Sequence, residues 1–140
     1  MNTWLLDSGP LVAYLIPDDP FHERAKSALN GFHGELITTS AVVVESMHFL
    51  KRYLEGPRRL IDFLHGADVQ ITESCQPRSL RLAVALMRKY ADIPMDFADA
   101  SLVVMANDLR LHHVCTIDRR GFSVFRTSFG RRFQIVLEGV

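Results

Sequence analysis

Short apolar runs alternate with helical segments along the whole chain, and this alternation limits the fold more than any other feature. Strand-like runs cover residues 3–6, 36–39, 68–71 and 114–117, and one of the segments 122–126 and 133–137 is expected to supply a fifth strand. This order of elements is typical of an α/β domain, in which helices cover both faces of a mostly parallel sheet and the crossovers are right-handed. We therefore expect a three-layer α/β/α sandwich with about five strands.

The helical segments are marked by the spacing of their apolar residues and by the residues at their ends. Asp19, Ser40 and Asp96 stand where helix N-caps are preferred, and Gly56 with Pro57 stands where a helix ends. We expect helices over residues 11–16, 20–30, 40–54, 57–64, 80–87 and 97–109.

Length and composition fit one globular domain over residues 1–140, since 140 residues with 48% hydrophobic content can bury a core without metals or disulfides. Cys75 and Cys115 are expected to be buried free thiols. Because no apolar run approaches a membrane span and Asp7 stands where a signal peptide would be basic, we expect a cytoplasmic protein that does not contact a membrane. Sixteen basic and sixteen acidic residues balance, so nucleic-acid binding would depend on local patches.

Four carboxylates far apart in sequence are expected to meet at one edge of the sheet. Asp7 ends the first strand and Asp118 follows the fourth, and sites in parallel sheets form where the strands end. The helix that leads into the fourth strand must run back across the sheet, so Asp99 near its start lies at the same edge. Glu45 lies one or two turns into the helix that leaves the second strand, close to that edge.

Carboxylates gathered in this way repel one another, and a bound cation or a raised pKa relieves the repulsion. Oxygen ligands suit Mg²⁺ or Mn²⁺, and Mg²⁺ favours a few carboxylates together with water and substrate phosphate. The leading reaction class is therefore metal-assisted hydrolysis of a phosphodiester. The histidines contain no HxxxH pair, so zinc is not expected.

Four segments also carry a family resemblance. They resemble the four successive acidic motifs of PIN-domain proteins, in order and over nearly the whole chain: LLDSGPLVAYL, SAVVVESMHFL, PMDFADASLVVMA and CTIDRRGFSVFR. Within that superfamily the chain is most similar to the virulence-associated (VapC-type) ribonuclease toxins of toxin–antitoxin pairs. The resemblance implies a parallel sheet between helices, Mg²⁺ or Mn²⁺ at the acidic cluster, endonucleolytic cutting of RNA, and a homodimer inhibited by a small antitoxin.

The resemblance also assigns roles to individual positions. Those matching the catalytic and metal-binding carboxylates are Asp7, Glu45, Asp99 and Asp118. Ser8 and Thr116 match supporting hydroxyl residues, and Asp96 matches a metal ligand found in a subgroup of the family, although it could equally serve only as a helix cap. Arg119 and Arg120 would position RNA phosphates, and Phe97 and Phe122 lie close to the expected site.

Other interpretations of these residues stay open. Taken singly, Asp7 and Asp118 are common turn residues and Glu45 could be a solvated glutamate. The start LLDSG is similar to phosphatases with an aspartyl nucleophile, but Gly9 stands where their second aspartate would be. A catalytically silent PIN-like module that binds RNA or protein is the alternative from another class, and a housekeeping RNA-processing nuclease is the alternative within the same class.

Overall fold

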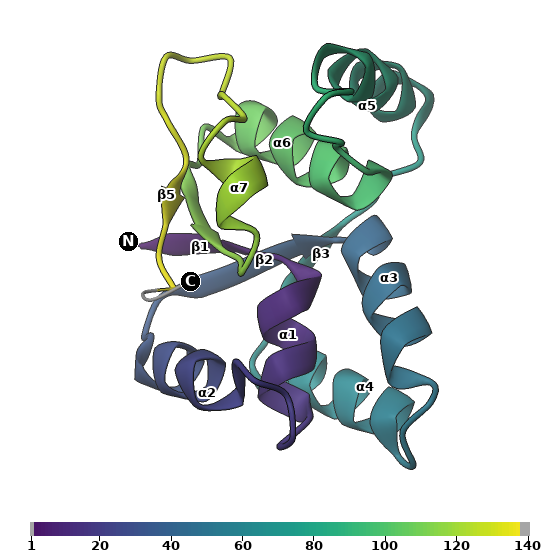
Figure 1. Cartoon of the computed structure of the whole chain (residues 1–140), viewed down its shortest axis with the longest axis vertical. Helices are drawn as coiled ribbons and strands as arrows, with labels where there is room; N and C mark the ends of the chain where they lie inside the picture. The colour runs from purple at the N-terminus through teal and green to yellow at the C-terminus, as the bar shows by residue number, and fades with distance from the viewer. Residues whose placement is uncertain (1, 138–140) are drawn as a thin grey trace.

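The computed structural model describes residues 2–137 and contains, within them, a sheet of five parallel strands (Figure 1). The strands lie in the order β3-β2-β1-β4-β5, so β1 is central. Their bounds are Thr3–Leu6 for β1, Glu35–Thr39 for β2, Gln70–Thr72 for β3, His113–Cys115 for β4 and Gln134–Ile135 for β5. The fifth strand therefore comes from the segment 133–137.

Helices cover both faces of the sheet, which confirms the expected three-layer sandwich (Figure 1). On one side are α1 (Ser8–Leu15), α2 (His22–Gly31), α3 (Ser40–Leu50) and α4 (Gly56–Gly66). On the other are α5 (Pro77–Lys89), α6 (Phe97–Leu109) and the short α7 (Arg119–Phe122). Among the described residues, no helix is long and apolar enough to cross a membrane.

Successive residues of the central strands point into two separate cores. Leu5 and Val114 are buried in the core beneath α6, whereas Leu6 and Cys115 are buried in the core beneath α1 and α4. This alternation is the two-residue repeat of a strand covered on both faces. The backbone N–H of Asp7 donates to the carbonyl of Cys115 at 3.0 Å, so the chain stays paired with β4 as it leaves β1.

Several helix boundaries differ from expectation because hydrogen bonds at the helix starts decide them. The first helix begins at Ser8 rather than residue 11, since the Asp7 carboxylate accepts from the Ser8 N–H at 2.8 Å. The α3 N-cap is Thr39 rather than Ser40, and α3 ends at Leu50, which leaves Leu54 91% exposed. Asp19 does not cap α2: its carboxylate accepts from the N–H of Phe21 at 2.8 Å, one residue before that helix begins.

Of the two segments considered for the fifth strand, 122–126 is not a strand, because Phe122 ends α7 and, within the segment, only Arg126 forms a single bridge. Three other expectations were wrong in part. The third strand begins at Gln70 because Asp68 adopts a left-handed turn conformation with φ of 50°. Cys115 is buried as expected, but Cys75 is exposed. The fourth strand ends at Cys115, so residues 116 and 117 lie beyond it.

Candidate active site

Helices α1, α6 and α7 begin at the edge of the sheet where β1 and β4 end. Asp7 is the N-cap of α1, Asp96 of α6 and Asp118 of α7, and each carboxylate accepts a hydrogen bond from a backbone N–H near the start of its helix. An N-cap carboxylate satisfies a donor that has no partner within the helix and is favoured by the helix dipole. Helix capping therefore explains why three of the five predicted carboxylates lie at this edge.

Asp7 is the most deeply buried of these carboxylates, with 6% of its surface exposed. Its Oδ1 accepts from the Ser8 backbone, and its Oδ2 accepts from the Thr116 hydroxyl at 2.7 Å. The two oxygens are thus fixed from α1 on one side and from the end of β4 on the other. Both partners are residues that the sequence predicted as supporting.

Glu45 lies in the second turn of α3 and reaches the same place. The Ser8 hydroxyl donates to Glu45 Oε1, so Ser8 contacts Asp7 through its backbone and Glu45 through its side chain. Ser8 itself is buried. This one residue joins the first and second acidic motifs, which are 37 residues apart.

Asp96 and Asp99 form a reciprocal capping box at the start of α6. Asp96 Oδ1 accepts from the N–H of Asp99 at 2.8 Å, and Asp99 Oδ2 accepts from the N–H of Asp96 at 3.2 Å. The expected cap at Asp96 is confirmed, and Asp99 takes the position usually held by Glu or Gln. Both residues therefore stabilise the start of α6, and the metal-binding role of Asp96 stays a prediction.

Asp118 is joined to Asp7 through Thr116. The Thr116 hydroxyl donates to Asp7 and accepts from the backbone N–H of Asp118 at 2.9 Å. The carboxylate of Asp118 accepts from the N–H of Gly121 at 3.0 Å, and a side chain at position 121 would collide with it. A glycine at this position lets the short helix α7 close against the site.

Burial and mutual repulsion raise the pKa values of three carboxyls at this edge. Burial raises the pKa of Asp7 to about 6, and the charges of Glu45 and Asp96 add to the rise, although the bonds from Thr116 and Ser8 oppose it. Burial raises the pKa of Asp99 to about 8, with contributions from the charges of Asp7 and Asp96. The pKa of Glu45 is also raised, first by burial and then by the charge of Asp96, against the bond from Ser8.

These shifts describe a cluster with too much negative charge for its surroundings. A divalent cation held by oxygen atoms would lower the energy of the ionised carboxylates, and the donor set suits Mg²⁺ or Mn²⁺. Within residues 2–137, no group of three or more acidic, histidine or cysteine side chains is arranged so that it could hold a metal ion. An open arrangement fits Mg²⁺, which keeps several waters and commonly takes only one or two carboxylates from the protein.

The remaining predicted residues lie on or beside these elements. Arg119 and Arg120 are exposed on α7, directly after Asp118. Phe122 is fully buried in the core, whereas Phe97 is half-buried at the start of α6.

Sequence reasoning missed two polar residues beside the carboxylates. Ser101 is buried one turn along α6, where its hydroxyl pairs with Thr39 at 2.7 Å, and Glu73 accepts from the Ser40 hydroxyl at 3.1 Å. The Ser101 bond ties the start of α6 to the end of β2. A serine within an otherwise apolar helix was the available signal for Ser101, whereas Glu73 carried none.

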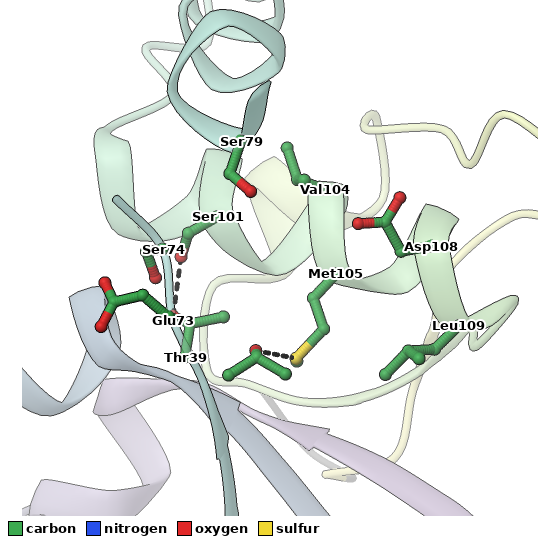
Figure 2. A pocket seen from close by; sticks show the side chains of 10 residues that line it. Thr39, Glu73, Ser74, Ser79, Ser101, Val104, Met105, Asp108 and Leu109 are labelled. Carbon is green, nitrogen blue, oxygen red and sulfur yellow. Dashed lines mark hydrogen bonds between the residues drawn. The ribbon is translucent and has the colours of Figure 1, made fainter. Parts of the chain in front are cut away.

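A separate cavity of about 140 Å³ lies behind this edge, between β3, α5 and α6 (Figure 2). The Thr39 and Ser101 hydroxyls pair beside it, and the Thr72 hydroxyl donates to the sulfur of Met105 at 2.8 Å. None of the predicted site carboxylates is among the described residues that line it. This cavity is therefore not the acidic site.

Comparison with known proteins identifies the family and supports the fold. Ribonuclease VapC26 of Mycobacterium tuberculosis is 25% identical over 134 residues, which cover 94% of this chain and 98% of that protein. The crystal structure of M. tuberculosis VapC20, described as a sarcin-ricin loop cleaving toxin, has a TM-score of 0.77 at 13% identity and shares the fold over 89% of this chain and 97% of the other. The PIN domain family matches residues 4–127, a span that contains every carboxylate described above, and the chain belongs to that family.

Proposed function

We propose that this protein is a metal-dependent endoribonuclease that hydrolyses RNA phosphodiester bonds, with the whole chain acting as a single nuclease domain. The observation that carries the proposal is the group of carboxylates that Ser8 and Thr116 join where β1 and β4 end, and the pKa values of three of the carboxyls at this edge are raised by burial and by neighbouring charges. Membership of the PIN domain family and similarity to a protein named as a ribonuclease support the choice of reaction.

In this proposal Asp7, Asp99 and Asp118 hold Mg²⁺ or Mn²⁺, Glu45 completes the group, and Asp96 is a further candidate ligand. The ion would neutralise charge on the phosphate and promote ionisation of water. Glu45, whose carboxylate accepts from the Ser8 hydroxyl, would hold the attacking water and accept its proton. The water oxygen would bond to phosphorus as the bond from phosphorus to the leaving ribose oxygen breaks, and that oxygen would take a proton from solvent water.

Thr116 and Ser8 hold the carboxylates rather than contact RNA. Thr116 fixes one oxygen of Asp7 while it accepts from the backbone of Asp118. Arg119 and Arg120, exposed next to Asp118, would bind phosphates without reading sequence, so RNA binding should weaken as salt rises.

The biological setting is proposed on the same similarity. VapC20 is described as a toxin and VapC26 shares the VapC name, so we propose that this protein is the toxin of a type II toxin–antitoxin pair. It would act in the cytoplasm as a homodimer and be inhibited by a small antitoxin protein. An antitoxin Arg or Lys directed at the acidic cluster would compensate the same charge as the metal.

A silent PIN-like module that binds RNA or protein is the second candidate, favoured by the zero net charge of the chain. The intact set of predicted carboxylates argues against it, because a binding module has no need to keep repelling charges together. A housekeeping RNA-processing nuclease would use the same residues on another RNA.

Cleavage of a mixed pool of structured RNAs tests the proposal. The purified protein is incubated with Mg²⁺, Mn²⁺ or EDTA beside Asp99→Asn, which removes one charge and keeps a side chain of the same size. We expect cutting that requires metal and is lost in the folded variant. Cutting that survives EDTA or the substitution would contradict the proposal, and binding without cutting would favour the silent module.

A further inference from the structure

An open groove continues from the acidic cluster between the starts of α3 and α6. Its volume is about 500 Å³, within the range of roughly 300–1,000 Å³ usual for small-molecule sites. Glu45 and Asp96 line the groove and also belong to the acidic cluster. If a phosphate of the substrate lies at the carboxylates, the chemical group next to that phosphate therefore lies at the mouth of this groove.

The charge of the groove excludes a phosphate as its occupant. Besides Glu45 and Asp96 it is lined by Glu73, and none of the described residues that line it is a lysine or an arginine. A phosphate here would meet several like charges without a cation to offset them. The exposed arginines of α7 follow Asp118, at the end of β4, whereas the groove lies between α3 and α6.

Apart from Ser40 and Cys75, the remaining residues that line the groove are apolar and include one aromatic ring. Ala41, Val44 and Ala98 form part of the wall, and Phe97 packs partly against the core beneath α6 while it also lines the groove. Val44 is 69% exposed. An aromatic ring that packs partly against the core and lines an open groove can serve as a stacking platform for a flat, uncharged group.

We propose that this groove binds one unpaired nucleobase of the RNA, stacked on Phe97, next to the phosphate that lies at the acidic cluster. The proposal rests on the proposed function for the position of that phosphate. A base fits the groove because it is flat and uncharged, and its amino groups can donate to carboxylates. It also requires the base to be outside a helix, as is usual in protein recognition of RNA loops and single strands.

The experiment measures the coupling between Phe97 and a single base in a binding assay. Single-stranded hexaribonucleotides of mixed sequence, each lacking the base at one position in turn, are titrated by fluorescence anisotropy in Ca²⁺, with gel analysis to verify that they stay intact. For the wild-type protein we expect removal of the base at one position to weaken binding about tenfold, the usual size of a base–aromatic stack. For Phe97→Ala the same removal should have no further effect.

Two variants serve as matched controls. Phe97→Leu keeps an apolar side chain and loses the ring, so most of the position-specific effect should disappear although the fold is retained. Phe49→Ala removes a phenylalanine that is 42% exposed on α3 and does not line the groove, so the position-specific effect should remain. Thermal unfolding of each variant verifies that the protein is folded.

The result that would overturn the proposal is equal sensitivity to base removal in the wild-type protein and in folded Phe97→Leu. Failure of the proposed function would look different, because the wild-type protein would then bind with the expected coupling and yet cut no RNA in Mg²⁺. Cutting without coupling would leave the nuclease in place and show that the groove holds another part of the RNA or a protein side chain.

Discussion

Asp7 and Asp118 stand at the ends of neighbouring strands and both cap helices, yet their surroundings differ. Burial raises the pKa of Asp7 to about 6, with smaller contributions from the charges of Glu45 and Asp96, although two hydrogen bonds oppose the rise. Asp118 accepts from the backbone of α7, and its own N–H bonds to Thr116. Both carboxylates accept from a donor at a helix start, but Asp7 is buried beside other carboxylates, whereas Asp118 is only half-buried.

This difference separates two tasks that one carboxylate can perform. A cap stabilises a helix whether or not an ion is bound, and an asparagine can replace it. A buried group of repelling carboxylates destabilises the folded protein, and its retention makes sense if a cation or an RNA complex relieves it. We therefore expect the two regions to respond differently to charge removal.

The largest expected effect is on cleavage by variants of Asp118. Asp118→Asn keeps the cap and removes the charge, so stability should change by less than about 0.5 kcal/mol while cleavage falls by about two to three orders of magnitude. Asp118→Ala should lose the same activity and, in addition, about 1 kcal/mol of stability. Single-turnover cleavage and thermal unfolding measure the two quantities. Wild-type activity in Asp118→Asn would show that this residue is only a cap.

The next effect concerns the pH dependence of stability without metal. The pKa of Asp7 is about 6 and that of Asp99 about 8, both above the ordinary value of 3.8, so folding favours the protonated forms. The stability gained from the protonated forms of Asp7 and Asp99 is fully present below about pH 4 and is lost as the pH rises through 6 and then 8. For Asp7 the loss is of the order of 3 kcal/mol.

Thermal unfolding in EDTA between pH 4 and pH 9 measures this loss. Mg²⁺ should restore stability at pH 8, because an ion that binds only the folded protein stabilises it. Asp99→Asn is the matched control and should show a smaller loss over the same range. Equal curves for the variant and the wild-type protein would mean that the carboxylates do not repel as described.

A smaller effect is expected at Thr116, which links the two regions. Thr116→Val keeps the shape of the side chain but removes the hydroxyl that donates to Asp7 and accepts from the N–H of Asp118. We expect a loss of about 1–3 kcal/mol in stability and weaker cleavage, whereas Thr116→Ser should retain most of both. A Val variant as stable and active as the Ser variant would show that the hydroxyl does not hold the site.

The topology could be predicted because apolar periodicity and helix-start residues agree along most of the chain. Asp7, Asp99 and Asp118 could be assigned to one edge from connectivity alone, since the carboxyl ends of parallel strands share that edge. The sequence left the fifth strand open between 122–126 and 133–137, because the apolar residues of both segments suggest a strand. In the structure Phe122 and Phe125 are both buried and three residues apart, while Val124 is 40% exposed, which is the spacing of a helical turn.

Details that depend on tertiary contacts were beyond the sequence. The choice of Thr39 over Ser40 as the α3 cap follows from the bond of Ser40 to Glu73 and from the contact of Thr39 with Ser101. The groove beside Phe97 likewise forms between two helices that are far apart in sequence. Neither the choice of cap nor the groove can be recognised from a local pattern in a single sequence.

The binding of Mn²⁺ at pH 8 tests the central claim most directly, because it asks whether the group of carboxylates around Asp7 is a cation site. Electron paramagnetic resonance of free Mn²⁺ gives the dissociation constant for the wild-type protein and for folded Asp7→Asn. We predict saturable binding by the wild-type protein and at least about tenfold weaker binding by the variant. Equal binding by the two proteins, or none by the wild type, would contradict the account.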